Sequence, residues 1–258
     1  MMTNMPLLKI LPSNSSYKGK RSEQQDSFGF SRFDDQNLIS HGGILAVVAD
    51  GMGGFNGGAI ASRRAVIAMR TSYQTKLSWE SIPDALLRAL GQANRAVFEL
   101  ATAIDSEGHC GTTLVAAVVH ANSLYWVSVG DSRLYLFRNK KLYCLTDDHV
   151  YGSYEQNLAF TPQINSRQEA QSGVLTSWLG LRKLPQICIR HDPMPLKTGD
   201  RLLLCTDGLF KTLPESEITK LLINSKHQTA AGALIDVVMQ LDKSNQDNAT
   251  AIVLEIID

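Results

Sequence analysis

The chain has 258 residues, of which 44% are hydrophobic and 19% charged, and its 25 lysines and arginines balance its 25 aspartates and glutamates. Zero net charge and the lack of any long apolar run argue against nucleic-acid or membrane partners. Four cysteines without a CxxC pair indicate reduced, buried thiols and a cytoplasmic globular protein.

Apolar runs rich in β-branched and aromatic residues predict strands, and hairpin-length connections at 120–123 and 139–140 separate two pairs of them. The runs are residues 44–50, 112–119, 124–130, 133–138, 141–146, 201–207 and 249–257. Helical periodicity appears near 59–70, in the stripe Leu86, Leu90, Ala93, Val97 and Leu100, and over about 230–241. Helices segregated from hairpin-linked strands predict an α+β layered domain, and no linker divides residues 1–258.

Residues 149–173 differ from the rest of the chain because they are polar, contain Pro162 and follow neither period. A segment of this length without a pattern is typical of a functional flap or a mobile insertion. It lies between two aspartate-bearing runs, so it is placed to overhang the rim that they share. We expect His149 itself to be a hydrogen-bonded packing residue.

Four of the strand-like runs carry an aspartate at one end. Asp50, Asp131 and Asp207 close their runs, whereas Asp247 opens the last one. If the last strand is antiparallel to the others, all four carboxylates reach the same rim of the sheets. Clustered anions repel one another, and hard divalent cations prefer oxygen ligands. The pattern therefore predicts a metal site.

Each of these acids also has an ordinary structural explanation. Asp50-Gly51 is a favoured turn pair, and Gly130 and Asp131 can form the turn of a hairpin between two strands. Asp207 can end a strand, and Asp247 can start one by hydrogen-bonding its own backbone. Asn, Ser or Gly would serve such turns as well, yet all four are acids, which favours the metal interpretation. In that interpretation the Gly51 carbonyl can approach an ion as a neutral ligand.

Arg21 lies five residues before Asp26 in the segment GKRSEQQDSFGF. Charges in such a run are ordinarily solvated or form a surface ion pair. Beside a metal cluster, however, a planar guanidinium suits phosphate because it binds two oxygens at once. A functional role for Arg21 thus depends on the metal site.

Seven motifs occur in a fixed order over about residues 17–257: GKRSEQQDSFGF, VVADGMGG, GTTLVAAVV, VGDSRLYLF, LTDDH, LLLCTDGLF and DNATAIVL. In their order and spacing the chain resembles the metal-dependent protein phosphatases, the type 2C serine/threonine phosphatases. Its compact length and the DGMGG form resemble their stand-alone bacterial branch. The resemblance implies a four-layer α-β-β-α sandwich, in which helices flank two antiparallel sheets.

The resemblance also implies a set of metal ligands. Asp50, Asp207 and Asp247 would hold two Mn²⁺ or Mg²⁺ ions with the help of the Gly51 carbonyl. Asp131, together with Asp207, would bind a third, weaker ion. Two such ions can share a bridging water, lower its pKa and offset charge on the phosphoryl oxygens during in-line attack, so that no side-chain nucleophile is needed.

Further residues receive supporting roles from the same resemblance. Asp26 would orient metal-bound waters, and Arg21 would grip the phosphate. Asn248 would support Asp247. The segment from about 149 to 180 would be the flap that governs substrate access.

The expected protein is thus a monomeric phosphatase that acts on phosphoprotein substrates of a Ser/Thr kinase. The alternative is a non-catalytic phosphoprotein-binding regulator on the same fold, which should have lost a metal ligand, and this chain has not. A cysteine-based phosphatase is excluded because no cysteine is followed by an arginine six positions later. A P-loop enzyme is disfavoured because the glycines after Asp50 lack a Gly-Lys-Ser/Thr ending.

Overall fold

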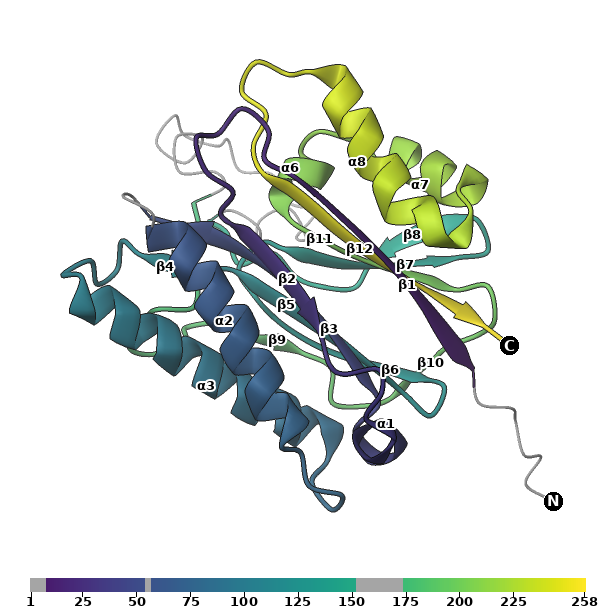
Figure 1. The fold of residues 1–258 in the computed structure, drawn as a ribbon, viewed down its shortest axis with the longest axis horizontal. Helices are drawn as coiled ribbons and strands as arrows, with labels where there is room; N and C mark the ends of the chain where they lie inside the picture. The colour runs from purple at the N-terminus through teal and green to yellow at the C-terminus, as the bar shows by residue number, and fades with distance from the viewer. Residues whose placement is uncertain (1–7, 54–56, 152–173) are drawn as a thin grey trace, which may run out of the picture.

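The computed structural model describes residues 8–53, 57–151 and 174–258, in which two antiparallel sheets pack face to face (Figure 1). One sheet has the strand order β1 (Lys9–Tyr17), β12 (Ala249–Ile257), β11 (Arg201–Cys205), β7 (Arg133–Arg138) and β8 (Lys141–Cys144). The other has the order β10 (Met194–Pro195), β6 (Ser123–Val129), β5 (Leu114–His120), β3 (Ile44–Met52) and β2 (Asp26–Phe30), with β4 (Gly111–Thr112) paired to β3 and β9 (Cys188–Ile189) paired to β6. Most of the predicted flap at 149–180 lies outside the described residues.

Helices cover the two outer faces of this pair of sheets (Figure 1). The sheet that contains β3 is covered by α2 (Gly57–Gln74) and α3 (Ile82–Ala103), and the short α1 (Gln36–Gly42) connects β2 to β3. The five-stranded sheet is covered by α6 (Asp207–Phe210), α7 (Glu215–Asn224) and α8 (Ala230–Leu241), with a 3-10 turn at His227–Thr229 before α8. The predicted four-layer α-β-β-α sandwich is confirmed.

Three apolar layers hold the four structural layers together. In β3, Leu45 and Val47 pack toward α2 and α3, whereas Ala46 and Val48 pack toward the other sheet. Because both faces of the strand are buried, its sequence is continuously apolar instead of alternating. The same double burial explains why the strand-like runs of this chain are conspicuous in the sequence.

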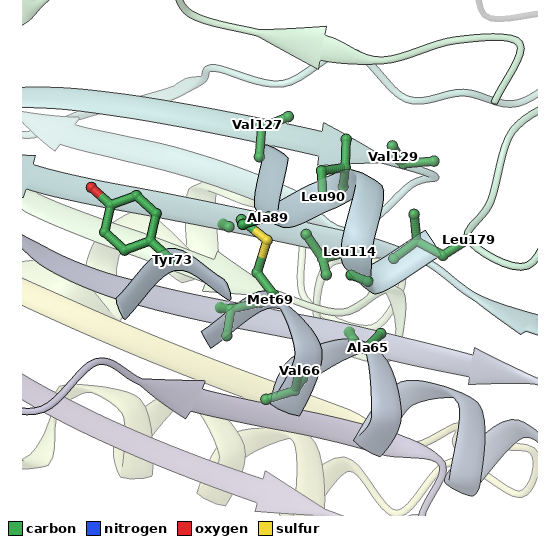
Figure 2. Close-up of a cluster of buried hydrophobic side chains, with 14 of the residues drawn as sticks. Ala65, Val66, Met69, Tyr73, Ala89, Leu90, Leu114, Val127, Val129 and Leu179 are labelled. Atoms are coloured by element: carbon green, nitrogen blue, oxygen red, sulfur yellow. The ribbon is translucent and has the colours of Figure 1, made fainter. Parts of the chain in front are cut away.

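The layer beneath α2 and α3 contains the helical stripe predicted over residues 86–100. Ser81 caps the N-terminus of α3 by accepting the N–H of Asp84, and the stripe residues are buried. Figure 2 shows side chains of both helices, Met69 of α2 and Leu90 of α3 among them, directed toward Leu114 of the sheet. This layer fixes the sheet to the helices at the end of β3 that leads to Asp50.

Some expectations are corrected by the structure. β1 was not predicted because its sequence, KILPSNSSY, is largely polar, yet it pairs with β12 over its whole length as an edge strand, where proline is tolerated. The run 201–207 ends as a strand at Cys205, and Asp207 begins α6. Of the cysteines expected to be buried, Cys144 is exposed and Cys188 half-buried. None of the helices in the described ranges is both long enough and apolar enough to cross a membrane.

Met69 gives a test of the apolar layer. Its side chain is fully buried, so Met69→Ala should lower the free energy of unfolding by about 2–5 kcal/mol through lost burial and a cavity. The same substitution at Met239, which is 47% exposed on α8, should change it by less than about 0.5 kcal/mol. Urea unfolding of both variants measures the difference, and equal losses would contradict the packing described for α2.

Candidate metal centre

Asp26 and Asp50 face each other across neighbouring strands. The antiparallel register of β2 and β3 sets Asp26 opposite Asp50, so both side chains lie on the face of the sheet that is turned to the other sheet. The backbone of Asp50 is held on both sides: its N–H donates to the Thr113 hydroxyl (3.0 Å), and its carbonyl accepts from the Thr113 N–H (2.9 Å) and the Thr112 hydroxyl (2.7 Å). The position of the Asp50 carboxylate is therefore set by the strand pairing.

The Asp26 carboxylate connects the two sheets. Its Oδ2 accepts hydrogen bonds from the hydroxyl of Thr206, which follows β11 (2.8 Å), and from that of Thr250 in β12 (2.7 Å). Thr250 also donates its N–H to the Thr206 hydroxyl (2.9 Å), so the two threonines hold each other. The other oxygen, Oδ1, is buried and has no hydrogen-bond partner. Asp26 thus presents one fixed, unpaired oxygen.

Asp207 reaches the same region from the five-stranded sheet. It is the first residue of α6, directly after Thr206. Its Oδ2 accepts from the Lys211 ammonium (2.6 Å), and its Oδ1 is buried without a partner. Like Asp26, it has one oxygen engaged and one unpaired.

Asp247 lies just before β12 and is bound by an arginine. Arg21 donates from Nε to Oδ1 (2.7 Å) and from Nη2 to Oδ2 (2.6 Å), and the N–H of Asn248 also donates to Oδ1 (2.8 Å). Because the Arg21 side chain is 62% exposed, this ion pair stands at the open side of the site. Arg21, predicted to bind phosphate beside the metal cluster, is paired with Asp247.

Asn248 holds the segment that carries Arg21. Its Oδ1 accepts the N–H of Gln25 (2.7 Å), and its Nδ2 donates to the carbonyls of Lys18 (2.7 Å) and Glu23 (3.0 Å). These three bonds attach residues 18–25 to the start of β12. The side chain of Asn248 thus holds this segment, and only its backbone N–H contacts Asp247, the residue that it was predicted to support.

Gly51 occupies a position where no side chain fits. A Cβ there would lie 2.1 Å from the Gly58 carbonyl oxygen and 2.8 Å from that of Gln25. Its N–H donates to the same Gln25 oxygen (3.1 Å). The glycine is thus required by the close approach of three backbone segments beside Asp50.

Asp131 follows a turn at Gly130 that His149 supports. Gly130 has a φ of +98°. Its N–H donates to Nδ1 of the buried His149 (3.1 Å), and the N–H of His149 donates to the Gly130 carbonyl (3.0 Å). The Asp131 carboxylate lies 3.6 Å from the Lys211 ammonium.

The carboxylates share a poorly solvated environment. Burial, together with the charge of nearby carboxylates such as Asp207, raises the pKa of Asp26 to about 7 and that of Asp131 to about 6. Burial and then the charge of Asp26 raise the pKa of Asp50 well above its ordinary value. Mutual repulsion of this kind requires that the acids lie close together.

The residues fit hard divalent cations. Asp50, Asp131, Asp207 and Asp247 line a cleft of about 390 Å³ together with the Gly51 backbone. In the described ranges no three acidic, histidine or cysteine side chains are already closed into a metal cage. The two unpaired buried oxygens, on Asp26 and Asp207, nevertheless need a cation or a donor, because an unsatisfied buried carboxylate is costly. An oxygen-only donor set suits Mg²⁺ or Mn²⁺.

Sequence reasoning missed the groups that hold or neutralise the acids. Thr113, Thr206 and Thr250 lie in apolar strand runs, where a threonine is an ordinary β-former and carries no functional pattern. Lys211 could have been found, because it lies four residues after Asp207, a spacing at which side chains meet on a helix.

Comparison with known proteins identifies the family. The family model described as protein phosphatase 2C matches residues 16–245. The serine/threonine phosphatase stp of Listeria monocytogenes is 30% identical over 243 residues, which are 91% of each chain. The crystal structure of the Mycobacterium tuberculosis serine/threonine phosphatase PstP/Ppp has a TM-score of 0.78 at 25% identity over 98% of this chain and 100% of that chain. A structure of the PstP catalytic domain in complex with two manganese ions has a TM-score of 0.76 at 26% identity, with the same coverage.

The chain belongs to the protein phosphatase 2C family and is a phosphoprotein phosphatase. The predicted membership is confirmed. The cleft described above is lined by Arg21 and by Asp50, Asp131, Asp207 and Asp247, and the buried Asp26 lies directly behind it, opposite Asp50 in the strand register.

The raised pKa of Asp26 makes the metal-free protein sensitive to pH. An acid whose pKa is higher in the folded chain binds more protons when folded, so stability falls as pH rises from about 4 toward 7. Asp26→Asn keeps a side-chain oxygen for Thr206 and Thr250 and removes the charge. It should reduce this pH dependence by up to about 1.4 kcal/mol per pH unit.

Unfolding of the chelated protein across this range measures the effect. The control is Asp236→Asn, at an exposed carboxylate of α8, which should leave the slope unchanged. A slope in Asp26→Asn equal to that of the wild type would contradict the raised pKa of Asp26 in the folded protein.

Proposed function

We propose that this member of the protein phosphatase 2C family hydrolyses phosphoserine and phosphothreonine in proteins with two bound Mn²⁺ or Mg²⁺ ions. The observation that carries the proposal is the meeting of Asp50, Asp207 and Asp247 from both sheets at one cleft, with Asp26 paired opposite Asp50. Buried oxygens of Asp26 and Asp207 are left unpaired there. The relatives named as serine/threonine phosphatases, and the PstP domain with its two manganese ions, support it.

The ion ligands in this proposal are Asp50, Asp207, Asp247 and the Gly51 carbonyl. When bound, the ions would supply Lewis-acid stabilisation of phosphoryl charge and a water of lowered pKa for in-line attack. Asp50 has its backbone fixed by Thr112 and Thr113, and Asp207 presents Oδ1. Asp131 is not assigned to this pair, because Lys211 lies between it and Asp207.

Asp26 orients water in the cleft. Two threonine hydroxyls hold its Oδ2, so Oδ1 cannot turn away and remains an acceptor for a water proton. The bonds to Thr206 and Thr250 reach across the sandwich, which makes the position of this acceptor a property of the fold. Asp26 thereby acts on water and leaves the substrate to other groups.

Arg21 binds the phosphate monoester. Its guanidinium engages both oxygens of Asp247, the same two-point geometry that it would use for two phosphate oxygens. Beside it, a groove of about 560 Å³ lined by Lys20, Lys243 and Gln246 offers room for the polypeptide on either side of the phosphorylated residue. Asn248 anchors the segment that carries Arg21 and so keeps the guanidinium at the cleft.

The chain works as one catalytic domain and as a monomer on proteins phosphorylated by a Ser/Thr kinase. The continuous apolar layers around both sheets support a single domain. The segment at about 149–180 is proposed as the flap that controls substrate access, since Leu175, one of its described residues, lines the cleft.

Asp207→Asn tests the reaction and the metal together. The variant keeps the size of the side chain and loses the anionic ligand, so kcat/KM for a phosphothreonine peptide should fall at least about 100-fold in Mn²⁺ or Mg²⁺. Exhaustive chelation should abolish wild-type turnover, and Asp236→Asn on α8 is the matched control. Turnover that survives chelation would refute the proposal, and binding of the phosphopeptide without hydrolysis would favour the non-catalytic regulator.

Arg21→Ala tests phosphate binding. Loss of a two-point charged contact should raise KM for the phosphopeptide about tenfold and change kcat less. Arg32→Ala is the control, since Arg32 binds Asp34 through two nitrogens and is similarly exposed. Steady-state kinetics distinguish the two variants, and an unchanged KM in Arg21→Ala would remove Arg21 from the substrate site.

A further inference from the structure

A lysine lies between two of the acids in the cleft. Lys211 follows α6, and its N–H donates to the Asp207 carbonyl (2.8 Å), so its side chain leaves the helix on the same face as that of Asp207. The Lys211 ammonium is 2.6 Å from Asp207 Oδ2 and 3.6 Å from Asp131 Oδ2. One protein cation therefore contacts carboxylates that the two sheets bring together.

The surroundings of this lysine differ from those of a surface ion pair. The side chains of Asp131 and Asp207 are only 10% and 17% exposed, whereas that of Lys211 is 56% exposed. The lysine thus reaches inward from the solvent side and delivers its charge to two largely buried anions. Buried anions in this position need a cation, because mutual repulsion and desolvation both oppose their charge.

The two oxygens of Asp207 are divided between different tasks. Oδ2 is occupied by Lys211, while Oδ1 is buried and unpaired. An ion bound by Oδ1 would leave the contact with Lys211 intact. An ion that bridged Asp131 Oδ2 and Asp207 Oδ2 would instead have to take the place of the ammonium.

We propose that Lys211 supplies the positive charge between Asp131 and Asp207, so that the centre binds two divalent ions and no third ion at these acids. The inference rests on the proposed two-ion function and replaces the third, weaker ion expected at Asp131 and Asp207 from the sequence. A divalent ion at this position would be repelled by an ammonium a few ångströms away. The ammonium is covalently attached, so its charge stays at the cleft at every metal concentration.

The test is the number of Mn²⁺ ions bound per chain, measured by equilibrium dialysis with elemental analysis up to millimolar free Mn²⁺. The wild type should saturate at two ions. Lys211→Met keeps the aliphatic length of the side chain and removes its charge. The variant should bind a third Mn²⁺ ion with an affinity at least about tenfold higher than that of the wild type for any third ion. Adding Asp131→Asn to Lys211→Met should abolish that gain. Lys220→Met, which removes an exposed lysine paired with Glu217 on α7, should behave as the wild type.

Other outcomes overturn the inference. A wild type that binds three ions and loses one on Asp131→Asn would show that Asp131 is a ligand despite Lys211. If the wild type and Lys211→Met both bind two Mn²⁺ ions, Lys211 does not prevent the binding of a third ion. If Lys211→Met fails to fold in thermal melts, the comparison of the wild type with Asp131→Asn still decides, since both should bind two. Failure of the proposed function has a separate readout, namely fewer than two ions or no phosphopeptide hydrolysis by the wild type.

Discussion

Repulsion among carboxylates held at one end of a sandwich is the interaction on which this site depends. Asp26 and Asp50 are brought together by the register of β2 and β3, and Asp207 approaches from the opposite sheet. Like charges in a poorly solvated cleft oppose one another, so the free energy that keeps them together comes from elsewhere. This free energy comes from the apolar layers and from the strand pairing. The acids that it holds together repel one another and are therefore stabilised by bound cations.

The fold was largely predictable where local sequence determines structure. The run over 230–241 matches α8, and the strand run that ends at Asp50 matches most of β3, because burial on one or both faces leaves a period in the sequence. β1 was not predictable in this way. Its alternating serines and its proline have no strand pattern, and only the pairing with β12 makes the segment extended. A strand that forms only by pairing with a distant segment cannot be recognised from its own short sequence.

The acids of the site were predictable from the sequence, and their partners were not. An aspartate at the end of an apolar run lies at the edge of a sheet. The positions of Asp50, Asp207 and Asp247 within their runs therefore suffice to predict that they lie close together. The hydroxyls that hold Asp26 come from Thr206 and Thr250, about 180 and 224 residues further along the chain. Both threonines lie within the sequence motifs, but a threonine is an ordinary strand residue, and the role of these two in holding Asp26 is created by the contact between the sheets.

The two cations at the cleft are held in different ways, and this separates their functions. Lys211 lies one helical turn after Asp207, so the local geometry of α6 alone keeps the two side chains together. Arg21 meets Asp247 only because Asn248 attaches residues 18–25 to the start of β12. A cation fixed by local geometry suits a permanent charge, whereas one carried by an anchored loop can exchange a carboxylate for a phosphate. In the proposed function, the cleft therefore combines a lysine whose charge is permanent with an arginine that would exchange Asp247 for the phosphate.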